Sequence, residues 1–145
     1  MLPSGGRRAL SRADRNQAAS DFHEWRKANK ALWYELRLLE AAGGMIRWHL
    51  RALHRAGTWL GDEHNVVVLC AELSKDVSVC AGPLDVDRLS AAANRYQCEL
   101  RRKALASARP IYRRKARDYV RTIERAWKTA RHRSRGREAQ SRAAA

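Results

Sequence analysis

The chain has 145 residues, and 30 Lys and Arg against 15 Asp and Glu give it a formal charge of +15. This length fits one ordinary domain, and a hydrophobic content of 45% is sufficient for a buried core. The charge argues against a small neutral substrate and favours an anionic partner. Because no run approaches about 18 apolar residues and the N-terminus lacks the apolar core of a secretory signal, the sequence predicts a cytoplasmic protein without membrane contact.

The positive charge consists mostly of arginine and lies mostly in the second part of the chain. Arginine supplies 24 of the 30 basic residues, and its guanidinium fork matches phosphate bidentately. Residues 88–145 carry a net charge of +14, whereas residues 1–87 carry +1. An Arg- and Ala-rich composition also follows from a high-GC genome, so composition alone leaves a neutral explanation open beside phosphate binding.

Apolar residues spaced by three and four predict an all-α protein without strands. Residues 1–17 are predicted to be a disordered basic leader, residues 18–132 an antiparallel helical bundle, and residues 133–145 a disordered basic tail. The helices of the bundle are expected at about 20–42, 45–60, 66–73, 86–108 and 111–132.

Capping residues, glycine and proline set the predicted helix boundaries. Ser20 or Asp21 can cap the first helix, which the Gly43-Gly44 pair ends. Gly61 and Asp62 predict a tight corner between the second and third helices. Residues 74–85 read as the main loop, and Pro110 is expected to end or kink the long helix.

One face of the first predicted helix is basic. At about 100° per residue, six side chains fall within one arc: His23, Arg26, Lys27, Lys30, Tyr34 and Arg37. Leu32 and Leu36 lie on the opposite, apolar side. The acidic residues Glu24, Glu35 and Glu40 fall outside the basic arc, so the row is expected to remain unneutralised. The alternative is an ordinary solvated helix face.

Two further basic rows are predicted. Arg47, Arg51 and His54 share one side of the second helix. Arg95, Arg102 and Arg109, preceded by Arg88, recur every seven residues along the long helix and form a ridge about 31 Å long. Three such rows would line a common groove for a linear polyanion if they converge, and periodicity leaves that open.

The sequence favours a binding protein over an enzyme. No metalloprotease motif and no Gly-rich phosphate loop occur, and His49 and His54 would point about 140° apart on a helix. Cys70, Cys80 and Cys98 match no metal spacing and are expected to be thiols in a reducing compartment. We therefore expect no metal, no cofactor and no catalysis.

Two ordered motifs resemble the CHAD family, an α-helical domain named for its histidines. The first has the form H-x-x-R-x-x-x-K-x-x-x-Y, matched by His23, Arg26, Lys30 and Tyr34. The second has the form L-G-D-x-H-[DN] before apolar residues, matched by Leu60, Gly61, Asp62, His64, Asn65, Val68 and Leu69, with Asn65 where the family usually has Asp. The later segment resembles the closing helices of the family at Arg102, Arg109, Tyr112 and Trp127, so that the resemblance extends from Asp21 to Trp127.

The resemblance implies packed helical bundles that bind inorganic polyphosphate along a basic channel without catalysis. The chain resembles the C-terminal half of such a domain, which leaves two alternatives: a truncated gene product, or pairing with a second copy or a complementary half-domain. The resemblance also implies association with polyphosphate granules. The residues expected to contact polyphosphate are His23, Arg26, Lys27, Lys30, Tyr34, Arg37, Arg47, Arg51, His54, His64, Arg95, Arg102 and Arg109.

Two alternatives to polyphosphate binding stay open. The basic ridge and C-terminal segment could bind nucleic acid without sequence specificity, although no RNA- or DNA-binding motif is present. The chain could also be a half-domain that completes a partner's bundle, for which exposed Trp25, Trp33 or Trp59 would be the sign.

Overall fold

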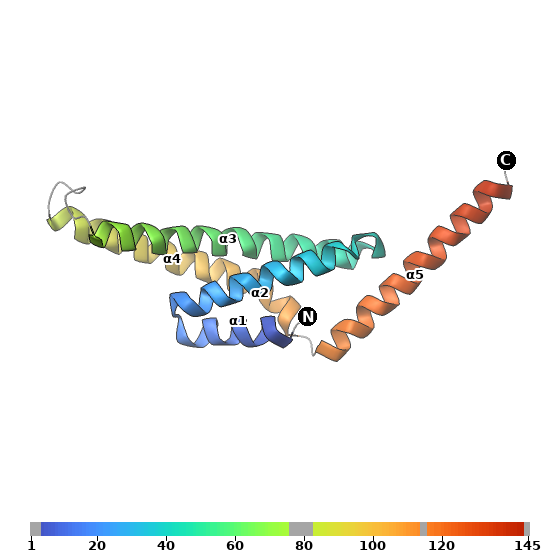
Figure 1. The fold of residues 1–145 in the computed structure, drawn as a ribbon, viewed down its shortest axis with the longest axis horizontal. Coiled ribbons are helices and arrows are strands. Elements are labelled where there is room, and N and C mark those ends of the chain that lie inside the picture. Colours follow the sequence, from blue (N-terminus) through green and yellow to red (C-terminus); the bar gives the residue numbers. More distant parts are fainter. Residues whose placement is uncertain (1–3, 76–82, 114–115, 144–145) are drawn as a thin grey trace.

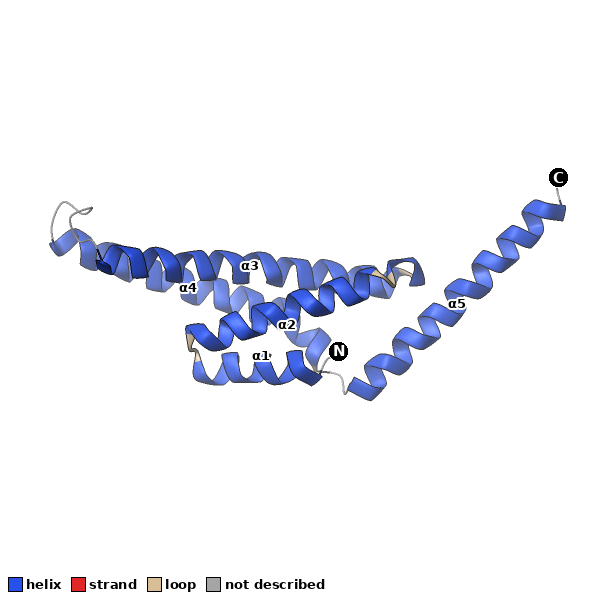
Figure 2. Ribbon diagram, viewed as in Figure 1, coloured by secondary structure: helices blue, strands red, loops and turns tan. Residues whose placement is uncertain are grey.

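The computed structural model describes residues 4–75, 83–113 and 116–143, and every element in these ranges is helical (Figures 1 and 2). The elements are α1 (Ser4–Asn16), α2 (Ala19–Arg37), the short 3-10 helix η1 (Glu40–Ala42), α3 (Gly44–Lys75), α4 (Pro83–Tyr112) and α5 (Ala116–Ala143). The predicted all-α fold class is confirmed.

Four helices form the bundle, and α5 projects from it. α3 packs against both α2 and α4, and α1 packs mainly against α2 (Figure 1). The N-terminal half of α5 lies at the end of the bundle near η1, and its C-terminal half points away from the other helices (Figure 1).

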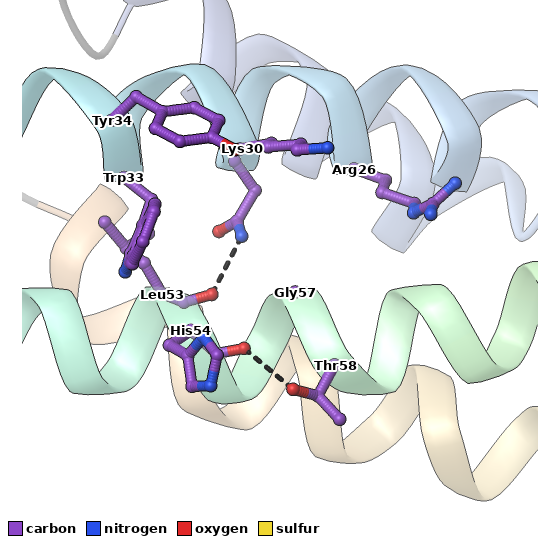
Figure 3. A pocket seen from close by; sticks show the side chains of 9 residues that line it. Arg26, Lys30, Trp33, Tyr34, Leu53, His54, Gly57 and Thr58 are labelled. Atoms are coloured by element: carbon purple, nitrogen blue, oxygen red, sulfur yellow. Dashed lines mark hydrogen bonds between the residues drawn. The ribbon is translucent and has the colours of Figure 1, made fainter.

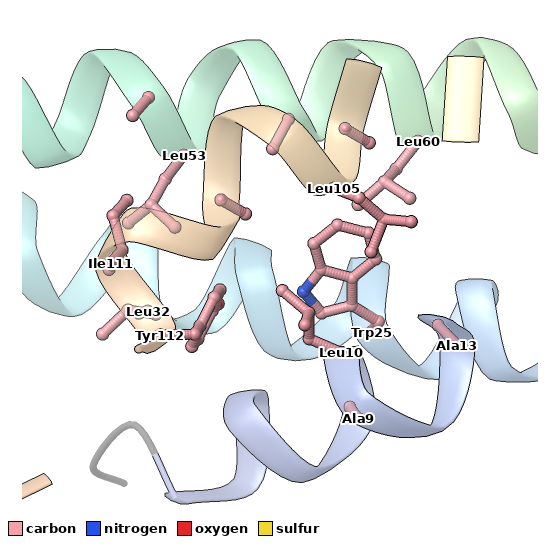
Figure 4. Packing of buried hydrophobic residues seen from close by; sticks show 14 of the residues in the cluster. Ala9, Leu10, Ala13, Trp25, Leu32, Leu53, Leu60, Leu105, Ile111 and Tyr112 are labelled. Carbon is pink, nitrogen blue, oxygen red and sulfur yellow. The ribbon is translucent and has the colours of Figure 1, made fainter. Parts of the chain in front are cut away.

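The core lies where α1, α2, α3 and α4 meet (Figure 4). Its largest apolar side chains include Phe22 and Trp25 of α2, which are fully buried. Leu53 and Leu60 of α3 and Leu105 of α4 pack into the same cluster. Because the apolar stripe of α2 faces this core, its basic face is left at the surface.

The prediction of a disordered leader is wrong, because α1 is part of the bundle. Ala9 and Ala13 are buried in the core, and their small side chains allow α1 to approach its neighbours closely. The Asp14 carboxylate also accepts a hydrogen bond of 2.8 Å from Arg109 of α4. The segment is polar and basic overall, so its few small apolar residues gave too weak a signal for a helix.

The predicted corner at Gly61 and Asp62 is also wrong, since both residues lie inside the continuous helix α3. A glycine inside a helix costs only about 1 kcal/mol relative to alanine. Burial of Leu60 and Glu63 on either side of these residues stabilises the uninterrupted helix. Of the predicted loop 74–85, residues 76–82 lie outside the described residues, and both ends of the loop are helical.

The remaining boundaries differ by several residues. α2 ends at Arg37, and a 3-10 turn follows before Gly43, whose φ of 120° suits only glycine. Neither Ser20 nor Asp21 caps α2: its N-cap is Ala18, which makes no side-chain capping bond.

The C-terminal helices extend further than predicted. α4 continues two residues past Pro110, because Ile111 and Tyr112 are buried in the core. The last helix occupies 116–143 instead of 111–132, so the predicted disordered tail is helical as far as Ala143. Its abundant Ala and Arg are strong helix formers, which outweighs the polar character on which the prediction relied.

Within the described ranges, no helix is both long enough and apolar enough to cross a membrane. Cys70 and Cys98 are free thiols, and Cys80 lies outside the described residues.

Candidate polyanion-binding groove

A surface cavity of about 360 Å³ lies between α2 and α3 (Figure 3). α2 contributes Arg26, Lys30 and Tyr34 to its lining, and α3 contributes His54 and Thr58. These α2 residues come from the predicted basic row, with Arg26 and Lys30 one turn apart on the same helix face. The structure therefore brings the rows of α2 and α3 together.

A second cavity, of about 430 Å³, continues the first along the same two helices. Trp33 and His54 line both cavities, so the two form one groove. The second cavity adds Arg37 from α2 and Arg47 and Arg51 from α3. We call the combined feature the basic groove, whose polar and charged predicted residues are Arg26, Lys30, Tyr34, Arg37, Arg47, Arg51 and His54.

The cations of the basic groove are available for a ligand. No ion pair within the described part of the chain engages Arg26, Lys30, Arg47 or Arg51. Among the residues that the structure describes, Glu40 is the only carboxylate that lines either cavity. Because guanidinium and ammonium groups only donate hydrogen bonds, this groove is suited to an anion with many oxygen acceptors.

Aromatic side chains fix the shape of the groove. The Trp33 ring lies 6.1 Å from the His54 ring and 5.1 Å from the Tyr34 ring, measured between centroids. The Arg37 guanidinium lies 5.0 Å from the Trp33 ring centroid, a cation–π contact that orients Arg37 beside the groove.

The floor of the groove is made by residues that hold α2 and α3 close together. Asn29 is buried, and its amide donates a 2.9 Å hydrogen bond to the carbonyl oxygen of Leu53 (Figure 3). A Cβ at Gly57 would lie 3.4 Å from this amide nitrogen, an ordinary van der Waals distance, so Gly57 lies directly beside Asn29. Sequence reasoning missed Asn29 and Gly57 as part of the site, although a polar Asn beside an apolar helix stripe was an available signal.

His23 and His64 pair with each other next to the basic groove. Their ring centroids are 5.3 Å apart, and both side chains are half-buried. His23 precedes Arg26 by about one turn on α2, and His64 follows Thr58 on α3. The pair therefore continues the contact between α2 and α3 beyond the end of the basic groove. Neither histidine lines the two cavities.

Lys27 differs from the rest of the basic row. Its ammonium lies 2.6 Å from the Glu24 carboxylate, and it lines neither cavity. The hydrogen bond from Lys27 lowers the pKa of Glu24 below its ordinary value. The expectation of an unneutralised row therefore fails at this position.

The ridge on α4 does not join the basic groove. Arg95 and Arg102 are exposed on α4 and line neither cavity. Arg109 is held by the Asp14 carboxylate of α1 at 2.8 Å. Three of the residues predicted to contact polyphosphate therefore lie outside the basic groove. Heptad spacing places residues on one helix face without specifying which surface that face contacts.

Arg101, which the sequence analysis did not single out, has a structural role. It is nearly buried, and its guanidinium donates to the Glu63 carboxylate at 2.7 and 2.9 Å and to the carbonyl oxygen of Gln17 at 2.8 Å. Gln97 also donates to Glu63 at 2.9 Å. This network ties α4 to α3 and to the turn between α1 and α2.

No group of three or more His, Cys, Asp or Glu side chains in the described ranges is arranged to hold a metal ion.

Residues 4–74 match the family model of the CHAD domain. The matched segment contains α1, α2 and nearly all of α3, and with them every residue that lines the basic groove. It begins earlier than the resemblance found from the motifs and does not extend to α4 or α5. No curated protein and no solved structure matches the chain.

Proposed function

Because residues 4–74 belong to the CHAD family, we propose that the basic groove binds inorganic polyphosphate and does not hydrolyse it. CHAD domains are known for polyphosphate-related roles in general. The observation that carries the proposal is the groove itself, where unpaired cations from α2 and α3 face one surface channel.

The geometry suits a linear ligand. Arg26 and Arg37 lie eleven residues apart on α2, which corresponds to about 16 Å along the helix axis. Arg47 and Arg51 of α3 face the same channel. Since each phosphate unit carries about one charge and the groove would bind it through Arg and Lys cations, binding would release counterions and weaken as salt rises.

We propose binding and not catalysis because the lining residues act on an anion as donors and positive charges. Glu40 is the single carboxylate among the described residues that line the two cavities. Among the described lining residues, His54 supplies the only imidazole, and Tyr34 and Thr58 supply the only hydroxyl groups. A protonated His54 would donate to phosphate from its exposed ring.

Nucleic-acid binding is the second candidate, favoured by the charges outside the groove. Arg95 and Arg102 are exposed on α4, and α5 carries nine Lys and Arg against three acids. Arg95 and Arg102 line neither cavity of the basic groove, and the phosphate backbone of a nucleic acid would bind such exposed residues through charge alone. We propose a cytoplasmic location, at polyphosphate granules, for the polyphosphate-binding function.

A competition titration separates the two candidates. A labelled long-chain polyphosphate bound to the full chain is displaced with unlabelled polyphosphate, single-stranded RNA or duplex DNA, all matched in phosphate count and near physiological salt. Polyphosphate should displace the label at a concentration at least about tenfold lower than either nucleic acid does. This ratio corresponds to a difference of about 1.4 kcal/mol in binding free energy. Equal displacement would refute an organised polyphosphate site and favour generic charge binding.

A further inference from the structure

A third cavity connects the bundle to α5. It has a volume of about 400 Å³ and lies between the start of α3 and the middle of α5. Arg47 lines this cavity and the basic groove, so the two surfaces meet at one side chain. On the α5 side the lining includes Ala126, Thr129 and Arg133. Arg47 and Arg133 form no ion pair within the described part of the chain.

The first half of α5 is anchored firmly enough to position Arg133. Tyr119 is only 2% exposed, and its ring centroid lies 5.3 Å from that of buried His49 on α3. Ile123 and Ala126 pack against the core one and two turns later. The face of α5 that bears Arg133 is therefore the face that meets the start of α3.

From this arrangement we propose that Arg47 and Arg133 form a phosphate-binding subsite that leads a polyphosphate chain out of the basic groove and onto α5. The inference rests on the proposed function and specifies its ligand as a chain longer than the groove. Lys128, Arg131 and Arg135 line a separate cavity of about 160 Å³ on the opposite face of α5, which is not part of the subsite.

The test compares two single-charge substitutions on α5. Arg133→Ala removes the subsite cation, whereas Arg131→Ala removes the same charge two residues earlier, about 200° around the helix. Affinities of the full chain are measured for tripolyphosphate and for long-chain polyphosphate. We expect Arg133→Ala to weaken long-chain binding about tenfold, the loss typical of a charged hydrogen bond, and to leave tripolyphosphate binding unchanged. Arg131→Ala should weaken long-chain polyphosphate binding by less than about threefold.

Each contrary result has a distinct meaning. Equal losses in the two variants, or no loss in Arg133→Ala, would overturn the subsite while the groove could still bind tripolyphosphate. Failure of the unaltered chain to bind either polyphosphate would overturn the proposed function itself.

A separate observation concerns the ends of α3 and α4 that extend past α1 and α2 (Figure 1). We call residues 64–75 of α3 and 85–99 of α4 the arm. No side chain described in the arm is buried, although the arm is rich in aliphatic residues. A groove of about 200 Å³ between its helices is lined in part by Leu69, Leu73, Val86 and Leu89. Leu69 is 50% exposed and Leu89 39% exposed.

We infer that the arm pairs with the arm of a second copy of the chain. A helix pair with no buried side chain needs a further apolar layer, and two such pairs related by a two-fold axis make a four-helix bundle. Charge opposes a second copy least at this surface, because the arm is nearly neutral. The arm has a net charge of −1, from Glu72, Asp85, Asp87 and Glu99 against Lys75, Arg88 and Arg95, in a chain of +15. Elsewhere two copies would repel each other.

Sedimentation equilibrium of the full chain tests this pairing. We expect the mass to rise from one chain to two as concentration increases into the millimolar range, where weak complexes are populated. Leu69→Glu with Leu89→Glu should keep the protein monomeric without loss of helical circular dichroism. Leu38→Glu is the matched control, because Leu38 is 83% exposed outside the arm and its substitution should leave the dimer intact. A monomer at every concentration, or a dimer unaffected by the arm substitutions, would overturn the inference.

Discussion

Gly6 of α1 tests whether the N-terminal segment belongs to the folded bundle. A Cβ added at Gly6 would lie 2.7 Å from Cε1 and 3.1 Å from the hydroxyl oxygen of Tyr112. Tyr112 is 2% exposed, and burial raises the pKa of its hydroxyl well above the ordinary range. Since ordinary contact begins near 3.4 Å, the buried ring or α1 would have to shift by about 0.7 Å.

Overpacking of this kind costs about 1–3 kcal/mol, and the better helix propensity of alanine returns about 0.5 kcal/mol. We therefore expect Gly6→Ala to lower the free energy of unfolding by about 1.5 kcal/mol, which corresponds to a fall in Tm of roughly 3–6 °C for a chain of this size. The assay is thermal and urea denaturation followed by circular dichroism at 222 nm.

Gly5→Ala is the matched control, because a Cβ at Gly5 meets nothing within 4 Å. It should leave the free energy of unfolding unchanged or raise it by about 0.5 kcal/mol. If Gly6→Ala is as stable as Gly5→Ala, then α1 does not pack on Tyr112, and the assignment of residues 4–16 to the bundle is refuted.

Three further predictions concern stability and share the same denaturation assay. Gly61→Ala should stabilise the protein by about 0.5–1 kcal/mol, since the residue lies inside α3 with open space around it, whereas a loss would indicate the corner predicted from the sequence. Gly43→Ala should destabilise it by about 1–3 kcal/mol because its φ is 120°, and an unchanged Tm would contradict that backbone conformation. Glu63→Ala should cost about 3 kcal/mol, since it leaves the nearly buried Arg101 without its carboxylate, and a cost below about 1 kcal/mol would show that the pair is solvated.

The helical character of the chain and the basic row of α2 could be predicted because both follow from local periodicity. Arg26, Lys30 and Tyr34 share one helix face by spacing alone, and the structure places them beside His54. The apolar stripe on the other side of α2 faces the core, as its period indicates.

The failures arose where a tertiary contact outweighed a local signal. Gly61 favours a helix end in isolation, yet the helix continues because Glu63 pairs with Arg101, 38 residues later in the sequence. Heptad spacing predicts that Arg95, Arg102 and Arg109 share one face of α4, but it does not specify what that face contacts. Arg109 instead contacts Asp14, in a segment whose helix the polar composition concealed.

The most direct test of whether the basic groove is the binding site removes equal charge from the groove and from the exposed face of α4. One variant carries Lys30→Gln and Arg51→Gln in the groove, and the other carries Arg95→Gln and Arg102→Gln on the exposed α4 face. Both lower the formal charge by two, and helical circular dichroism serves as the folding control. The groove account predicts that the first variant loses about a hundredfold in affinity for long-chain polyphosphate, as expected for two charged hydrogen-bonding groups, and the second less than about tenfold. Equal losses in the two variants would contradict it, because net charge would then explain the binding without a groove.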